Sequence, residues 1–229
     1  MPTAARELTA LQAAVAGEVL LPGSPGYEAA RLPAIARFHH VRPRAVVRCT
    51  AERDVVETLA VARLLRAPVA VRSGGHCFAG RSSTTGIVLD VSPMDTVALR
   101  DGVAEVGAGT RLGPLYDALD EHGLALPAGC GPTVGIAGLT LGGGFGPLGR
   151  RHGLTCDRLV GARVVRGDGR VVDCDAHHEP DLFWALRGGG GGGWVVTSLR
   201  FAPVPAPPTS VFHLAWHPEH AAAQRPEQV

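Results

Sequence analysis

One stretch of the sequence, Val69 to Gly80, places phosphate-binding residue types beside a nucleophile. Its apolar start predicts a buried strand, which runs directly into Arg72-Ser73-Gly74-Gly75-His76. The paired glycines leave N–H groups uncovered where a phosphate can approach, and the arginine and serine add a cation and a hydroxyl donor. The neutral imidazole is a nucleophile. The stretch predicts a phosphate-binding loop with a nucleophile at its mouth; the alternative is a tight turn with an exposed histidine.

A second glycine-rich stretch runs from Pro127 to Gly153. Its glycines recur at close intervals between single apolar residues, which suits neither an ordinary helix nor an ordinary strand. Flexible linkers are polar, whereas this stretch carries Val134, Ile136, Leu139, Leu141 and Phe145. We therefore expect backbone laid against a large planar or phosphorylated ligand, where side chains would collide.

Two other patterns are weaker indications of a binding site. Gly144 to Gly149 matches the G-x-G-x-x-G pattern, but Pro147 and Gly153 interrupt the helix that a dinucleotide-binding fold requires there. The histidine pairs at 39–40 and 177–178 point to different faces of their elements and lack a neighbouring carboxylate–histidine pattern. We expect neither an NAD-type Rossmann fold nor a metal site.

The composition excludes several classes of function. The chain has 229 residues, 45% of them apolar, and a net charge of +1, so nothing in the overall charge favours nucleic acid or an acidic membrane. All 22 basic residues are arginine, which excludes a P-loop lysine and Schiff-base chemistry. Five cysteines without a C-x-x-C pair predict neither a disulfide framework nor a zinc site. Without a leader or a membrane-spanning apolar run, we expect a soluble cytoplasmic protein.

Hydrophobic periodicity predicts the elements that position the first loop. Residues 4–19 carry apolar side chains at helical spacing. A strand over Ala45 to Cys49, a helix that Thr50 caps and that runs through Leu65, and the strand at Val69 form a βαβ unit. This unit ends on the Arg72 loop.

The remaining elements follow in alternating order. Asp101-Gly102 predicts a type I′ turn within a hairpin over residues 97–106. The others expected are a strand over 87–91, a helix from Thr110 to Gly123, a hairpin over 159–174, a short helix over 181–187 and a strand over 194–201. Beyond them Pro203, Pro205, Pro207 and Pro208 predict a semi-rigid linker.

Four motifs occur together: Arg72 to His76, Pro132 to Gly144, His152 to Asp157 and Leu182 to Gly191. In this combination and order they resemble the FAD-linked oxidases of the berberine-bridge-enzyme type. These belong to the larger vanillyl-alcohol oxidase and p-cresol methylhydroxylase superfamily. The resemblance covers about Val41 to Val204.

The resemblance implies an α+β fold, an FAD-binding domain of the p-cresol methylhydroxylase (PCMH) type. Two small α/β subdomains would hold the ADP half of the cofactor between them. The implied divisions are an N-terminal helix and lead-in at 1–40, the FAD-binding domain at 41–204, and a Pro-rich linker with the start of a truncated substrate domain at 205–229. The implied activity is oxidation of an alcohol, sugar or secondary-metabolite substrate, with oxygen as acceptor.

The resemblance also implies roles for individual residues. The first loop would hold the pyrophosphate, and His76 would attach FAD covalently through its neutral imidazole. No catalytic residue is assigned, because the family's base comes from parts beyond this domain. The residues expected to bind FAD are Arg72, Ser73, Gly74, Gly75, His76, Cys130, Thr133, Val134, Gly135, Gly138, Gly142, Gly143, Gly144, Gly146, Gly153, Leu154 and Val196.

The chain departs from the family pattern at three places. Many members attach FAD a second time through a cysteine directly before Pro-Thr-Val-Gly; here Gly131 stands there and Cys130 one residue earlier, as a possible second anchor. Gly192-Gly193-Trp194 replaces the usual Asn-Phe-Gly. Family members also continue into a substrate domain, so a partner chain or dimer would complete the site for small-molecule substrates. The alternative is a truncated, non-catalytic flavin-binding remnant.

Overall fold

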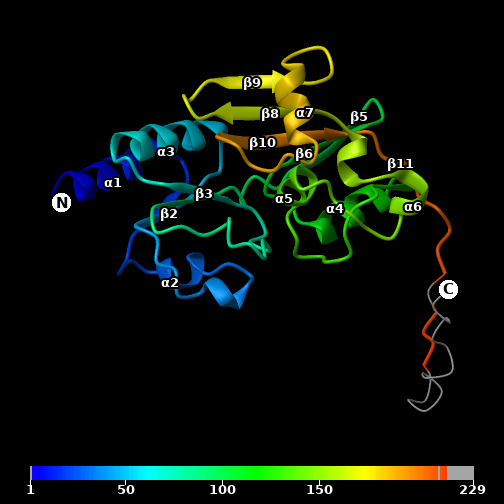
Figure 1. The fold of residues 1–229 in the computed structure, drawn as a ribbon, viewed down its shortest axis with the longest axis horizontal. Coiled ribbons are helices and arrows are strands. Elements are labelled where there is room, and N and C mark those ends of the chain that lie inside the picture. Colours follow the sequence, from blue (N-terminus) through cyan, green and yellow to red (C-terminus); the bar gives the residue numbers. More distant parts are fainter. Residues whose placement is uncertain (1, 211, 216–229) are drawn as a thin grey trace, which may run out of the picture.

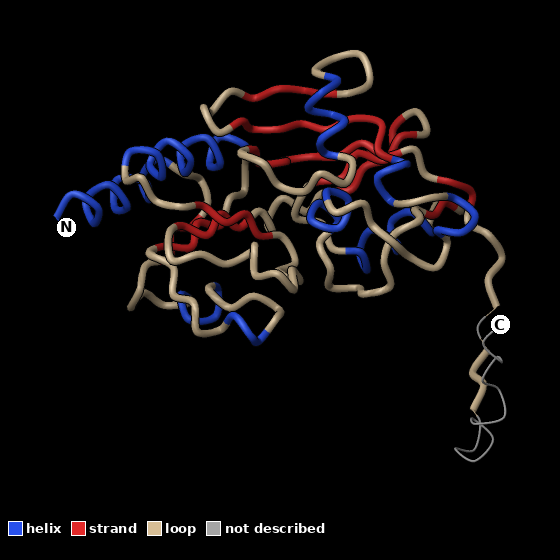
Figure 2. Tube along the Cα trace, viewed as in Figure 1, coloured by secondary structure: helices blue, strands red, loops and turns tan. Residues whose placement is uncertain are grey.

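Two β-sheets lie next to each other in the computed structural model, which describes residues 2–210 and 212–215 (Figures 1 and 2). One sheet has four strands and the other has five, and a two-stranded pair lies at the far end of the second. The fold is the expected α+β arrangement of two subdomains.

The first sheet has the order β1-β2-β4-β3, formed by β1 (Glu18–Leu20), β2 (Ala45–Arg48), β4 (Ile87–Asp90) and β3 (Val69–Arg72). Strands β2, β3 and β4 are parallel, and β1 is antiparallel to β2. Both faces of the sheet are covered. Val46 and Val88 pack with Tyr27 of α2 (Tyr27–Ala30), while Val47 and Leu89 belong to the main core with residues of α1 (Pro2–Ala14) and α3 (Glu52–Leu64). This double burial explains why the strands are continuously apolar.

The second sheet is antiparallel and has the order β5-β6-β10-β8-β9. Its strands are β5 (Val97–Arg100), β6 (Val103–Gly107), β10 (Trp194–Phe201), β8 (Leu159–Arg166) and β9 (Val171–Cys174). The other elements of this half are α4 (Leu112–Asp120), β7 (Leu124–Ala125), α5 (Ile136–Leu141), α6 (Gly149–His152), α7 (Pro180–Leu186), β11 (Val204–Pro205) and the 3₁₀ turn η2 (Thr155–Arg158); a further 3₁₀ turn, η1 (Ala36–Phe38), follows α2.

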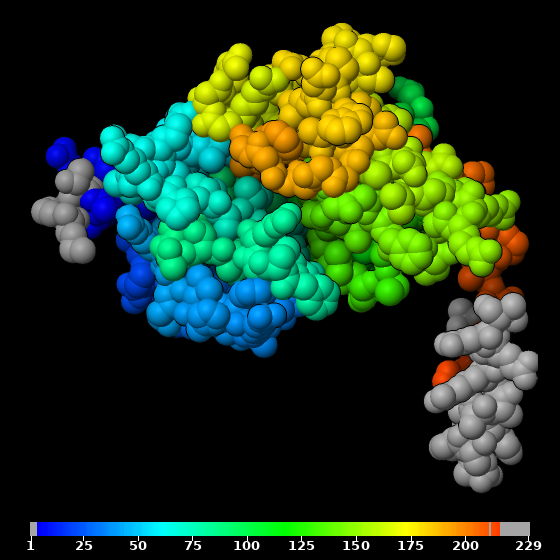
Figure 3. All heavy atoms as spheres, viewed as in Figure 1, coloured from blue at the N-terminus to red at the C-terminus, as the bar shows by residue number. Residues whose placement is uncertain are grey.

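The two halves share one hydrophobic core. A single cluster of buried side chains includes Leu59 of α3, Leu89 of β4, Leu112 of α4 and Leu199 of β10. Helix α3 contacts both β4 and β8, so it bridges the sheets. Figure 3 shows the N-terminal half, blue to teal, in contact with the green-to-orange remainder along a common seam. A shared core fixes the loops of both sheets relative to each other.

Several expected elements form within a residue or two of their predicted bounds. The hairpin turn is of the predicted type, since Asp101 and Gly102 have φ values of 50° and 78°. Strand β10 spans Trp194–Phe201 as expected. Within the described part of the chain, no helix combines the length and the apolar character that crossing a bilayer requires.

The predicted N-terminal helix over residues 4–19 is wrong over its last five residues. Helix α1 ends at Ala14, and Val19 lies in β1, paired with Val47. Leu8, Leu11, Val15 and Val19 are all buried, so the burial is as predicted although the helix stops early. Pairing with β2 satisfies backbone groups along the edge of the sheet, and helical periodicity alone does not reveal that alternative.

The predicted helix caps are also wrong by one residue. Ala51, and not Thr50, is the N-cap of α3, and Arg111, and not Thr110, is the N-cap of α4. At the start of α3 the Asp54 carboxylate accepts the backbone N–H groups of residues 50 and 51, and no described side chain caps the first turn.

The expected βαβ unit forms, since β2 and β3 are parallel and α3 connects them, and β4 lies between the two strands. A second prediction about connectivity is corrected. The proline-rich stretch does not begin as a linker, because β11 pairs with β7 and Val204 is buried. Ala206 continues this contact, donating its N–H to the carbonyl of Gly123 at 2.8 Å.

Candidate functional site

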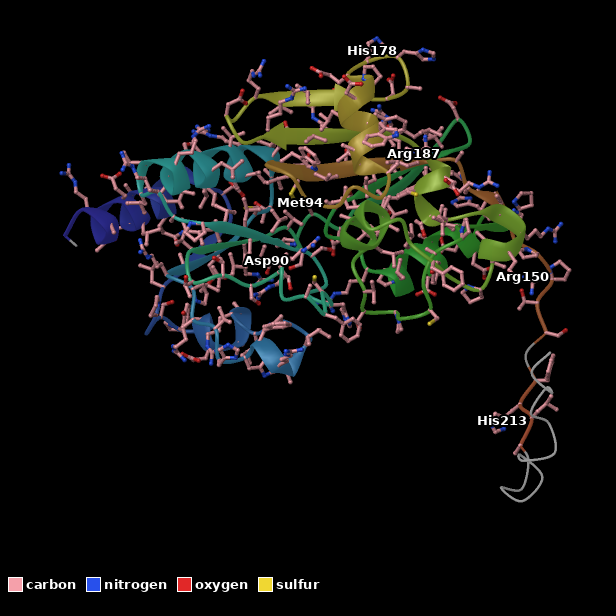
Figure 4. The ribbon with its side chains drawn as sticks, in the orientation of Figure 1. Asp90, Met94, Arg150, His178, Arg187 and His213 are labelled. Carbon is pink, nitrogen blue, oxygen red and sulfur yellow. The ribbon has the colours of Figure 1, made fainter. Side chains whose placement is uncertain are left out.

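The candidate site lies where the parallel strands of the first sheet end. The carboxyl ends of β2, β4 and β3 meet at one edge, which places Arg48, Asp90 and Arg72 in one row. In open α/β sheets this edge is the usual place for a ligand. Figure 4 shows Asp90 at this strand end and Met94, from the following loop, between the two sheets. The loop after β4 therefore reaches the second sheet.

Two glycines bring the first loop against the loop before α5. A Cβ at Gly74 would lie 2.6 Å from the Thr133 carbonyl oxygen, and one at Gly135 would lie 2.1 Å from Ser73 Oγ. No real Cβ tolerates such distances, so each loop needs glycine at its point of contact. The two motifs that the sequence analysis singled out thus meet face to face.

Backbone hydrogen bonds fix the loop before α5 from its other side. Leu112 donates its N–H to the Val134 carbonyl at 3.0 Å, and Gly113 donates to Pro132 at 2.9 Å. Ile136 donates back to the Thr110 carbonyl at 2.9 Å. These backbone hydrogen bonds therefore hold the Pro-Thr-Val-Gly segment against the start of α4.

The first loop has unused hydrogen-bond donors. Within the described part of the chain, the backbone N–H groups of Gly74, Gly75 and His76 donate to no other residue. Ser73 Oγ is buried and has no partner there either. Buried polar groups are normally satisfied, which makes this hydroxyl a candidate donor to a ligand. Successive free N–H groups favour an anion.

Arg72, expected to join this donor set, borders the same cavity but uses its side-chain donors within the protein. It is buried, and its Nε, Nη1 and Nη2 atoms donate to the carbonyls of Ser82, Ala30 and Arg31 at 3.0, 2.6 and 3.0 Å. Burial lowers the pKa of Arg72, against the opposing effect of Asp90. The guanidinium therefore anchors the base of the loop to the C-terminal end of α2 and to the loop before β4.

His76 lies at the end of the loop, beside the opposing motif. Its Nε2 atom is 3.0 Å from Thr133 Oγ1. The imidazole is partly buried, whereas Thr133 is exposed. The nucleophile and the hydroxyl come from loops 57 residues apart in sequence, so only the fold brings them together.

A cavity of about 380 Å³ extends along this edge. Ser73 and Gly74 line it together with Asp90, Ser92 and Arg111. The last three are candidate site residues that sequence reasoning missed. Asp90 ends β4, Ser92 follows it closely and Arg111 precedes α4, and a position at the end of a parallel strand was the available signal.

The glycine-rich stretch is partly helical, which corrects the expectation that no ordinary helix forms there. Gly138 lies within α5, where an added Cβ would meet nothing within 4 Å, and Gly142 is its C-cap. Further on, Gly144 and Gly146 approach Thr155 and the Ala128 carbonyl so closely that a Cβ would lie 2.3 and 1.7 Å away. These last two glycines are explained by packing within the protein.

The remaining predicted residues lie in different settings. Gly143 adjoins Leu154, whose side chain is 40% exposed, and Gly153 ends α6 against Asp157. Val196 is buried in β10, within the shared core. Its side chain is therefore enclosed by protein.

Cys130 is exposed on the loop before Gly131. Tyr116 donates its hydroxyl to the carbonyl of the adjacent Gly129, and burial together with nearby Cys130 raises the pKa of Tyr116 to about 12. A Cβ at Gly131 would lie 3.0 Å from a Val134 methyl group. The position before Pro-Thr-Val-Gly is thus too close to its neighbours to accept a cysteine without adjustment.

The comparisons with known proteins agree with this geometry. A family model described as an FAD binding domain matches residues 43–175. An uncharacterized FAD-linked oxidoreductase of Bacillus subtilis, YgaK, is 38% identical over 210 residues, covering 87% of this chain and 46% of the relative. The crystal structure of 6-hydroxy-D-nicotine oxidase from Arthrobacter nicotinovorans has a TM-score of 0.79 and 34% identity, covering 83% of this chain and 43% of that one.

A further similar structure is that of the glucooligosaccharide oxidase from Acremonium strictum, described as carrying a 6-S-cysteinyl, 8α-N1-histidyl FAD. Its TM-score is 0.81 at 31% identity, covering 86% of this chain and 42% of that one. The chain thus spans about half the length of the curated relatives it matches. It belongs to the FAD-binding-domain family of the berberine-bridge-enzyme-like oxidoreductases.

Proposed function

We propose that this chain binds FAD between its two sheets and forms the cofactor-holding part of an oxidoreductase. The observation that supports this most is the meeting of the Ser73–His76 loop with the Pro132–Gly135 segment. This junction combines free backbone donors, the unpartnered Ser73 hydroxyl and a histidine beside them. The backbone donors and the Ser73 hydroxyl fit a pyrophosphate, and the histidine fits the edge of a flavin.

In this proposal the chain's residues act mainly through the backbone. The N–H groups of Gly74, Gly75 and His76 and the hydroxyl of Ser73 bind the pyrophosphate. Arg111 lines the same cavity and adds a positive charge. Bound FAD would supply two-electron oxidation. The other FAD contacts predicted from the sequence, including those through Gly142, Gly143, Leu154 and the backbone at Val196, stay predictions.

We further propose that His76 attaches the flavin covalently and that Cys130 does not. The support is the place of His76 at the mouth of the donor loop and the glycine at position 131. The cysteinyl and histidyl linkages belong to the Acremonium enzyme, which this chain resembles. Cys130 would have to reach the ring from one residue further back along the loop.

The substrate proposed is an alcohol, a sugar or a secondary metabolite, with oxygen as acceptor. Relatives named (R)-6-hydroxynicotine oxidase, carbohydrate oxidase and tetrahydroberberine oxidase show how broad the choice is. We also propose that a partner chain or a second copy completes the substrate site. A cytoplasmic location stays a prediction.

The test is to purify the protein, record its visible spectrum and precipitate it with acid. We expect the absorption bands of an oxidised flavin, and yellow colour that stays with the precipitate. His76→Ala should release its flavin on denaturation, whereas Cys130→Ala, the matched control, should keep it. Colour retained by His76→Ala and lost by Cys130→Ala would assign the linkage to the cysteine.

A second arm separates oxidase activity from flavin binding. Substrate-dependent peroxide formation with bound flavin would support the oxidoreductase. Bound flavin that no alcohol, sugar or alkaloid reduces would favour the non-catalytic flavin-binding remnant. A protein that binds no FAD would contradict both.

A further inference from the structure

We propose that His39 is a positioning residue for FAD, because it holds in place the segment that supports the loop after β3. The inference rests on the proposed binding of FAD by that loop, and His39 lies outside the residues expected to bind the cofactor. His39 belongs to one of the two histidine pairs of the sequence. The two imidazoles of this pair bond to different carbonyls, and one of these, that of Pro33, belongs to a residue in contact with the loop.

The supporting segment, residues 32–38, lies against the loop at Gly75. A Cβ added to this glycine would lie 3.1 Å from the backbone nitrogen of Ala34 and 3.3 Å from Pro33 Cα. Gly75 also has a φ of 73°, which side chains disfavour, so both contact and conformation require glycine here. Pro33 lines the same cavity as Ser73. The segment therefore forms part of the site's wall.

Both ends of the supporting segment are fixed by contacts other than the His39 ring. Ahead of it, Arg72 donates to two carbonyls at the end of α2. At its other end, the ring of Phe38 lies where a Cβ on Gly80 would be 2.5 Å away. The middle of the segment, at Pro33, needs a hydrogen bond of its own to stay against the loop.

His39 provides this hydrogen bond. Its Nε2 atom is 2.9 Å from the Pro33 carbonyl oxygen, and since a carbonyl can only accept, Nε2 carries the hydrogen. Within the described part of the chain, no other residue donates to this carbonyl, and proline has no N–H with which to form a second bond. Arg31 donates to the carbonyl of His39 at 2.5 Å and so fixes the backbone that carries the ring.

Loss of the imidazole should therefore move the segment. Pro33 is buried, so its carbonyl would regain a partner only by turning toward water, which draws the segment away from Gly75. The loop would then be supported on one side only, where Gly74 contacts the Thr133 carbonyl. Donors that are not held in advance must be ordered when the ligand binds, and this weakens binding.

The test measures reversible FAD binding by equilibrium titration of the His76→Ala protein, in which no bond at residue 76 masks the affinity. We expect the further change His39→Leu to raise the dissociation constant about tenfold, the effect of one lost hydrogen bond. His40→Leu is the matched control. This neighbouring imidazole is exposed and bonds to the Arg37 carbonyl at 3.0 Å, so the dissociation constant should stay unchanged.

Two amide variants separate the lost hydrogen bond from the changed shape. The side-chain nitrogen of glutamine reaches about as far from the backbone as Nε2 of histidine, whereas that of asparagine ends one carbon earlier. His39→Gln should therefore bind FAD as tightly as the parent protein, and His39→Asn should bind as weakly as His39→Leu. Equal affinities of the two amide variants would overturn the positioning role. This comparison of two polar variants also serves where His39→Leu does not fold.

Limited proteolysis reports the position of the segment without any flavin. Trypsin cleaves after arginine, and Arg37 is exposed within η1. We expect cleavage there to be about tenfold faster in the His39→Leu apoprotein, and FAD to slow it in the parent protein, because binding and closure of the segment are coupled. Cleavage after Arg170, exposed between β8 and β9, should not change. Faster cleavage at both sites would indicate a general loss of stability and overturn the inference.

The outcomes distinguish this inference from the proposed function. A His39→Leu protein that binds FAD as tightly as the His40→Leu control would overturn the positioning role and leave FAD binding intact. A parent protein that binds no FAD would contradict both.

Discussion

Individual residues stabilise this fold mostly by hydrogen-bonding backbone groups that the sheets and helices leave unpaired. Arg72 donates to the carbonyls of two residues at the end of α2 and of one residue before β4. Asp54 accepts the N–H groups of Ala16, Gly17, Thr50 and Ala51. Both charged groups are almost fully buried, so losing either leaves several buried polar groups without partners.

Asp54 should make the stability of the protein depend on pH. Burial raises the pKa of Asp54, but the backbone N–H groups of Thr50 and Ala16 and the Thr50 hydroxyl outweigh burial and lower the pKa below its usual value. A lowered folded pKa contributes stability that is present above the unfolded value of about 3.9 and is lost as pH falls through the folded value. We expect Asp54→Asn to cost about 2 kcal/mol at pH 7.

The measurement is urea unfolding of both proteins from pH 7 down to pH 3. The difference between them should shrink as pH falls below about 4, because protonated Asp54 then resembles the amide. Other carboxylates, such as Asp175 with a pKa lowered to about 2 by backbone N–H bonds, affect both proteins equally. A difference that stays constant over this range would contradict the assignment.

The cysteines should differ sharply in reactivity. Burial raises the pKa of Cys49 to about 12 and that of Cys174 to about 11, and it raises the pKa of Cys156 as well. The thiolate is the reactive form, so these three should resist alkylation at pH 8. Cys130 is exposed and Cys77 partly so, and both should be labelled.

Peptide mapping after brief treatment with iodoacetamide checks this expectation. Denatured protein, in which all five thiols react, is the control. Native labelling of Cys49 at the rate of Cys130 would contradict it. Cys130 that stays alkylable in flavin-bound protein would also support attachment through His76 alone.

At the scale of elements, the site depends on close packing between loops that belong to different sheets. The β3 loop meets the segment before α5 at Gly74 and Gly135, and the start of α4 holds that segment from behind. Helix α5 itself is only six residues long and sits on Ile136, Ala137 and Thr140, all buried. The geometry of the donor loop is therefore set by contacts between elements and by no single element.

A methyl group at Gly135 should open this junction. The added Cβ would lie 2.1 Å from Ser73 Oγ and 2.6 Å from the Gly74 nitrogen, so the loops must separate. We expect Gly135→Ala to weaken FAD binding at least tenfold and to cost about 1–3 kcal/mol of stability, typical of overpacking.

Equilibrium titration with FAD and urea unfolding provide the two readings. Gly191→Ala is the control, because a Cβ there would meet nothing within 4 Å. Unchanged FAD affinity in Gly135→Ala would show that the junction does not shape the binding loop.

At the scale of the molecule, the two subdomains share one core, and we propose that the cofactor binds along their seam. Buried residues of α1, α3 and β4 belong to the same cluster as those of β6, β8 and β10. Helix α3 contacts both sheets, and Arg163 of β8 forms an ion pair with Glu52 at 2.7 Å. That pair is partly exposed and contributes little; the apolar contacts dominate.

The whole domain should consequently unfold in one transition. We expect far-UV circular dichroism and tryptophan fluorescence to give the same midpoint, because separation of the sheets exposes their common core. FAD added to the His76→Ala protein at about one hundred times its dissociation constant should add about 2.7 kcal/mol of stability. Two separate transitions would show that the halves fold independently.

Much of the fold and site follows from the sequence. The apolar runs at Ile87–Asp90 and Leu159–Arg166 predict strands because each is buried, and Asp101-Gly102 predicts its turn because few residues adopt that backbone conformation. The glycine motifs identified the loops that touch. Such features depend on a residue and its near neighbours, which a sequence contains in full.

The tertiary structure decided what depends on partners distant in the chain. The cationic side chain of Arg72 suggested a phosphate ligand, yet carbonyls 42 and 41 residues away bind it. Val19 continues a helical pattern but pairs with β2, and the N-cap of α3 is Ala51 instead of Thr50. The contact between His76 and Thr133 spans 57 residues. Each buried polar group bonds to the partner that the folded core places beside it. Because that partner can be distant in sequence, no local sequence pattern predicts it.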